Sequence, residues 1–116
     1  MNATATQTTP AAFRRASRVA EAVALEAGEL VNSITDGHAV TSQDVRELTS
    51  QISKVNNKRR STVDASTARF FYAAAFAFGR AADALILGNT ELAAERLDLG
   101  ANELDQVPAH IRGLFA

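Results

Sequence analysis

The sequence predicts an all-α protein, in which four helices pack as a bundle and a short helical turn follows at the C-terminus. Apolar residues recur at alternating steps of three and four along most of the 116 residues, which is the spacing of one helix face. Alanine, the best helix former, accounts for 24 of the 116 residues. No proline lies between Pro10 and Pro108, so long helices are not interrupted there.

A chain of this length forms one domain. We expect residues 1–8, which are small and polar, to be a disordered arm, and residues 9–116 to be a single helical domain. The first twenty residues contain arginine, serine and threonine but no acid, a composition that also fits a mitochondrial transit peptide. The apolar repeat continues through this segment to residue 34, which favours a helix of the domain.

The first helix begins at Thr9 and Pro10, a capping hydroxyl followed by proline at the first helical position. Its apolar face has a strict heptad spacing: Phe13, Ala16, Ala20, Val23, Ala27, Leu30 and Ile34. The pair Asp36-Gly37 ends the helix. Gly28 lowers helix stability relative to alanine, so we expect it to mark a close crossing with another helix.

The second helix begins after Thr41, and Asp44 completes a capping box with it. Its apolar face carries Val45, Leu48, Ile52 and Val55. The pattern fades at Asn56-Asn57, and residues 58–62 are predicted to be a polar connection.

The third helix is expected to start near Asp64 or Ser66 and to end at Leu87. Residues 70–78 hold five of the seven aromatic side chains, and a helix that is apolar nearly all round is buried or spans a membrane. Arg80 and Asp83 make the membrane interpretation costly, so we predict the buried centre of the bundle. A pocket for an apolar small molecule is a less favoured use of the same side chains: Phe70, Phe71, Tyr72, Phe76 and Phe78.

The segment Gly88-Asn89-Thr90 is a tight connection, so the third and fourth helices should form an antiparallel hairpin. The apolar face of the fourth helix carries Ala93, Leu97, Gly100, Leu104 and Val107. Pro108 is predicted to end this helix, and the tail to form one short turn.

Residue types exclude several classes of chemistry. The chain has no cysteine, so disulfides and thiolate sites are excluded. His38 and His110 do not have zinc-ligand spacing, and both are expected to be solvated. Phosphate-binding glycine loops and nucleophile motifs do not occur. We therefore predict no catalytic, cofactor-binding or metal-binding residue, and expect that the protein is not an enzyme.

The favoured function is that of a non-catalytic protein–protein interaction module, a small cytoplasmic adaptor, inhibitor or regulatory protein without membrane attachment. Ten arginines against two lysines, with the alanine excess, suggest a bacterial or phage origin. We also expect a homodimer, because the first and third helices carry more apolar surface than a small bundle needs. The predicted partner-binding residues are Arg14, Arg15, Arg18, Glu91, Glu95, Asp98, Asp105, Ile111, Leu114 and Phe115. Solvated outer faces would show the same charge patterns.

The alternative is a nucleic-acid-binding regulator that uses a basic cluster after the second helix: Lys54, Lys58, Arg59 and Arg60. Such side chains contact phosphates. They also complement the dipole at a helix C-terminus, and no aromatic residues interleave them to stack on bases.

Overall fold

A computed structural model describes residues 10–57, 60–61 and 63–115. The predicted arm over residues 1–8 and the capping residue Thr9 lie outside these ranges. The elements in order are α1 (Pro10–Thr35), α2 (Ser42–Ser53), β1 (Asn56–Asn57), β2 (Arg60–Ser61), α3 (Ala65–Ile86), α4 (Thr90–Asp105) and α5 (Val107–Leu114). The all-α bundle predicted from the sequence is confirmed.

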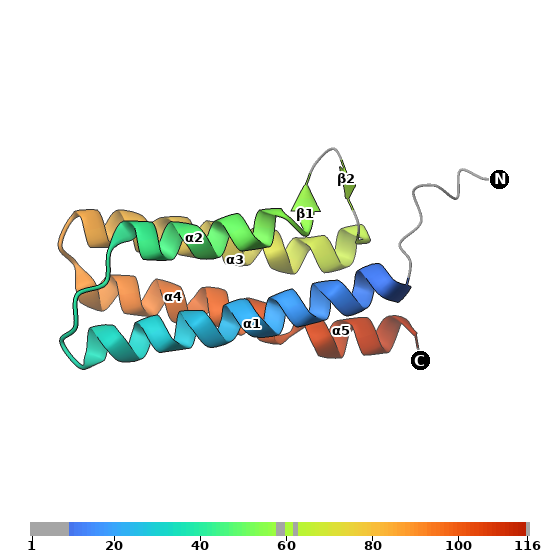
Figure 1. Cartoon of the computed structure of the whole chain (residues 1–116), viewed down its shortest axis with the longest axis horizontal. Helices are drawn as coiled ribbons and strands as arrows, with labels where there is room; N and C mark the ends of the chain where they lie inside the picture. Colours follow the sequence, from blue (N-terminus) through green and yellow to red (C-terminus); the bar gives the residue numbers. More distant parts are fainter. Residues whose placement is uncertain (1–9, 58–59, 62, 116) are drawn as a thin grey trace.

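The four long helices run alternately in opposite directions (Figure 1), so that each packs beside its neighbours in the chain. Contact between α1 and α4 closes the bundle, and α5 extends beyond α4 to lie against the start of α1. The molecule is elongated, with dimensions of 54 × 27 × 16 Å. Within the described ranges, no helix combines the length and the apolar character needed to cross a membrane.

Helix ends follow the predicted capping signals. Thr41 and Asp44 form the capping box: the Thr41 hydroxyl accepts from the Asp44 backbone N–H at 3.2 Å, and the Asp44 carboxylate accepts from that of Thr41 at 2.9 Å. Gly37 and Gly88 adopt φ values of +80° and +77° directly after α1 and α3, a conformation that glycine adopts at little cost.

Two connections differ from the prediction. β1 and β2 pair in an antiparallel manner, with Asn56 opposite Ser61, where we expected the polar connection to begin. The fourth helix ends at Asp105, before Pro108, so the prediction that Pro108 terminates it is wrong. Pro108 instead stands in the first turn of α5, where its missing N–H has no intrahelical partner to lose. The tail is therefore an eight-residue helix.

The heptad face of α1 is used within the chain. Its members from Phe13 to Ala27 are buried, while Leu30 and Ile34 are partly buried against the same core. The rest of the core comes mostly from the other helices, with Val55 and Val63 added by the segment between α2 and α3. The largest fully buried side chains are Phe71, Phe78, Leu48, Ile52, Leu97 and Leu104. The heptad face of α1 is therefore not available to a second copy and does not support a dimer.

The prediction that the third helix is the buried centre of the bundle holds for one side of the helix and not for the other. Phe71 and Phe78 are fully buried, but Tyr72 and Phe76 are 50% and 67% exposed. The reason is the position of α3, which packs mainly between α2 and α4 and leaves its third side open. The five aromatic side chains thus point to different sides of α3 and do not line one pocket.

The close helix crossing lies at Gly100, not at Gly28. A Cβ atom at Gly100 would come within 2.4 Å of the Phe78 ring, whereas a Cβ atom at Gly28 would meet nothing within 4 Å. The Phe78 ring thus occupies space that any larger residue of α4 would need. This contact sets the separation of α3 and α4.

We predict that Gly100→Ala destabilises the protein. Overpacking costs about 1–3 kcal/mol, and three atoms of the fully buried Phe78 ring lie within 3 Å of the position that the new Cβ would take. The helix-propensity gain of about 1 kcal/mol offsets part of this cost. Chemical denaturation should show a net loss, while the control Gly28→Ala should keep its propensity gain. Equal stabilisation of both variants would contradict the close crossing.

Candidate functional site

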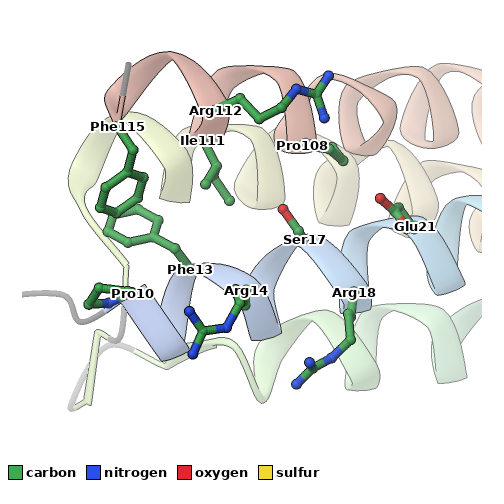
Figure 2. A pocket seen from close by; sticks show the side chains of 10 residues that line it. All are labelled: Pro10, Phe13, Arg14, Ser17, Arg18, Glu21, Pro108, Ile111, Arg112 and Phe115. Atoms are coloured by element: carbon green, nitrogen blue, oxygen red, sulfur yellow. The ribbon is translucent and has the colours of Figure 1, made fainter.

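A pocket of about 470 Å³ lies between the first half of α1 and the whole of α5. Figure 2 shows the side chains around it, which come from both helices. The lining residues are Pro10, Phe13, Arg14, Ser17, Arg18, Glu21, Pro108, Ile111, Arg112 and Phe115. Four of the predicted partner-binding residues are among them, although they come from opposite ends of the sequence.

The apolar part of this α1/α5 pocket is built around two phenylalanine rings. Phe13 and Phe115 meet edge to face, with ring centroids 5.0 Å apart and an angle of 84° between the rings. Such a pair contributes about 0.5–1.5 kcal/mol beyond the area it buries. Phe13 and Ile111 are buried, but Phe115 remains 56% exposed. The pocket therefore has a fixed apolar base and an accessible aromatic side chain at one end.

Three arginines belong to the lining of this pocket, Arg14 and Arg18 of α1 and Arg112 of α5. Figure 2 shows the guanidinium groups of Arg14 and Arg18 on the side of α1 away from α5, and Arg112 extending along α5 away from the two phenylalanine rings. All three side chains are exposed. Among the described residues of the lining, Glu21 is the one acidic side chain, so positive charge predominates among them. Arg112 lies in the last turn of α5, where the helix dipole favours a cation.

A second, shallower groove of about 280 Å³ lies between α1 and α2. It brings together Arg15 and Arg18 of α1 with Lys54, which directly follows α2. Members of the two predicted basic clusters are therefore neighbours. Lys58 and Arg59 lie outside the described residues, and only the backbone of Arg60 is described, in β2.

The other predicted contact residues lie away from these two grooves. Glu91, Glu95, Asp98 and Asp105 are all exposed on α4. Their steps of four, three and seven place them on one helix face, opposite the buried Leu97 and Leu104. Leu114 is 46% exposed on α5 and is not part of the pocket lining.

A polar cluster that the sequence analysis missed fixes α5 against α3. The Asp64 carboxylate accepts hydrogen bonds from the hydroxyls of Ser66 and Thr67, at the start of α3. Ser66 Oγ is 3.0 Å from Nε2 of His110, whose ring also meets Phe70 edge on at 5.1 Å. His110 is partly buried, so the prediction that it is solvated is wrong, whereas His38 is exposed.

The order of these hydrogen bonds differs from that of a hydrolytic triad. In a triad, the histidine lies between the serine and the carboxylate. Here Ser66 lies between them and gives its only proton to Asp64, so Nε2 of His110 must donate to Ser66. His110 does not accept the Ser66 proton in this arrangement. The cluster attaches α5, which forms one wall of the α1/α5 pocket, to α3.

No group of three or more histidine and carboxylate side chains in the described part of the chain is placed to hold a metal ion. Comparisons with protein-family models, with curated proteins and with solved structures found no match to this chain.

We predict that Asp64→Ala destabilises the protein in a pH-dependent way. Partial burial raises the pKa of Asp64, but hydrogen bonds from Ser66 and Thr67 outweigh it, so the pKa lies below the ordinary 3.8. The carboxylate therefore contributes stability above the unfolded-state pKa, and this contribution is lost as pH falls through the lower folded-state value. Loss of the carboxylate should cost about 0.5–1.5 kcal/mol at neutral pH for each of the two hydroxyl hydrogen bonds that it accepts.

Chemical denaturation over a pH series measures this difference between the variant and the wild type. It should be constant near neutral pH and should shrink once the pH falls below 3.8. The control is Asp36→Ala, at an exposed carboxylate beyond the end of α1. A difference that persisted through the acid range would contradict a role for the ionised carboxylate.

Proposed function

We propose that this protein is a non-catalytic interaction module that binds an acidic, amphipathic segment of another protein in the α1/α5 pocket. The observation that carries the proposal is the gathering of Arg14, Arg18, Ile111 and Phe115 around one pocket. Each was singled out from the sequence as a contact residue, and they are brought together only by folding.

Apolar and charged groups supply different parts of this recognition. Phe13, Ile111 and Phe115 offer a surface for one or two apolar anchors of the partner, and burial of such anchors supplies most of the affinity. Arg14, Arg18 and Arg112 are placed to meet carboxylates that flank the anchors, because guanidinium groups bind carboxylates through paired hydrogen bonds. The partner should therefore combine acidic and large apolar side chains.

The shape of the site favours a helical segment. Two helices form the walls, and an amphipathic helix places apolar residues at steps of three and four into such a groove. The volume of about 470 Å³ lies within the range of ligand-binding pockets. Exposed arginines also raise the rate of encounter with an acidic partner at low salt.

The remaining expectations from the sequence form part of the proposal. The acidic face of α4 is a second contact surface, suited to a basic partner. A cytoplasmic location and a bacterial or phage origin rest on the composition alone. We also propose self-association. The reason is the exposed apolar surface of α3, because the heptad face of α1 is buried within the chain.

We predict that a synthetic amphipathic helical peptide, with leucine and phenylalanine on one face and flanking glutamates, binds the α1/α5 pocket. Reversal of two charges in the variant Arg18→Glu/Arg112→Glu should weaken binding by about tenfold or more, because like charges then face each other. Calorimetry measures the affinity, and circular dichroism checks that the variant is folded.

The matched control is Arg46→Glu/Arg69→Glu, which changes the net charge equally at exposed arginines of α2 and α3 outside the pocket. A second control peptide has the same composition in scrambled order. Equal weakening by both double variants, or equal binding of both peptides, would point to non-specific charge attraction and would rule out a docking site.

A nucleic-acid-binding regulator is the second candidate, and the α1/α2 groove favours it. Arg15, Arg18 and Lys54 lie together there, and Lys58, Arg59 and Arg60 follow in the sequence. Such a cluster can neutralise several phosphates at once, and the counterions released make binding strongly dependent on salt.

If this second function holds, labelled duplex or single-stranded nucleic acid should bind with an affinity that falls steeply as salt rises. Replacement of Lys54, Lys58, Arg59 and Arg60 by alanine should flatten this slope, because phosphate contacts are removed. Fluorescence anisotropy measures both effects. The absence of binding at low salt would exclude nucleic acid as a direct ligand.

A further inference from the structure

The open side of α3 carries an exposed stripe of mixed character. Phe76, Arg80, Asp83 and Leu87 are all exposed, with Phe76 at 67% and Leu87 at 83%. Their steps of four, three and four keep them on one helix face. Large apolar side chains exposed singly are ordinary, but here two of them lie at the ends of one stripe and enclose an opposite-charge pair.

This stripe borders a shallow groove of about 300 Å³ between α3 and α4. Leu92 and Arg96 of α4 form the other side of the groove. The Arg80 guanidinium lies over the Phe76 ring, 5.7 Å from its centroid, and such a cation–π contact orients the arginine along the stripe. The face is therefore partly preformed.

We propose that two copies of this chain associate through the α3 stripe, with their α3 helices antiparallel. Successive residues of the stripe are four, three and four positions apart, so the spacing is the same from either end of the helix. An antiparallel copy that places its Asp83 opposite Arg80 therefore also places its Leu87 opposite Phe76. A two-fold axis forms each of these pairs twice.

A second copy suits this face better than a partner of one charge sign. The stripe holds one cation and one anion, so an acidic or a basic partner would leave one of them facing a like charge. An antiparallel second copy presents its own Asp83 and Arg80 in the order that satisfies both. Gly79 lies exposed next to the stripe, and nothing occupies the space where its Cβ would be, so another helix can approach the α3 backbone closely.

None of the four stripe residues belongs to the α1/α5 pocket, so the dimer proposal does not rest on the peptide-binding function.

Charge exchange across the interface tests the proposal. The wild type should be a dimer by sedimentation equilibrium, and Arg80→Asp or Asp83→Arg alone should raise the dissociation constant by about tenfold or more, because like charges then face each other twice. The double variant Arg80→Asp/Asp83→Arg should restore the dimer, since opposite charges again meet. Arg15→Asp, at an exposed arginine of α1, is the matched control and should leave the dimer unchanged.

Cross-linking tests the register directly, because the chain contains no cysteine of its own. A mixture of Phe76→Cys and Leu87→Cys proteins should form a mixed disulfide dimer more readily than either protein alone. Two copies paired in parallel would favour the self-linked products instead and would overturn the register.

Three results would overturn the dimer proposal. One is a wild-type monomer at concentrations up to about 100 µM. Another is a dimer that resists both single charge reversals. The third is a failure of the double variant to restore association while circular dichroism shows it folded. Peptide binding to the α1/α5 pocket is measured separately on the Arg80→Asp variant, so either proposal can fail without the other.

Discussion

The contact between Phe78 and Gly100 determines how α3 and α4, the two helices with the most extensive contact, face each other. The ring fills the space of the missing side chain, so α3 cannot rotate without losing it. With Phe71 and Phe78 turned inward, Tyr72 and Phe76 must face outward, since neighbouring helix positions differ by about 100°. The same contact turns Gly100 inward and the acidic residues of α4 outward.

The α1/α5 pocket depends on a different and more distant set of contacts. Besides its buried Val107 and Ile111, α5 is held by two contacts, from His110 to Ser66 of α3 and from Phe115 to Phe13 of α1. Both contacts position the wall of the pocket that α5 forms. The Asp64 carboxylate, which holds the Ser66 hydroxyl, therefore acts on the pocket from outside it, as a positioning residue.

Local signals in the sequence were sufficient for the four long helices, apart from the end of the fourth, but not for the surfaces. The cap at Thr41, the glycine end at Gly37 and the tight connection Gly88-Asn89-Thr90 involve residues a few positions apart, so they could be predicted from the sequence. Residues 70–78 are apolar on all sides and carry no periodicity from which a buried face can be chosen. The Ser66–His110 contact spans 44 positions, and no local pattern indicates which two segments meet at such a separation.

The two proposed surfaces would act together in a dimer. The α1/α5 pocket lies near the beginning of α3, where Ser66 meets His110, whereas the proposed two-fold axis passes close to the end of α3, between positions 80 and 83. An antiparallel pair would therefore carry its two pockets at opposite ends of a long particle. Such a dimer can bind two acidic segments only if they are far apart or belong to different molecules. Binding to a partner with two well-separated segments would gain avidity from this geometry, while closely spaced segments would not.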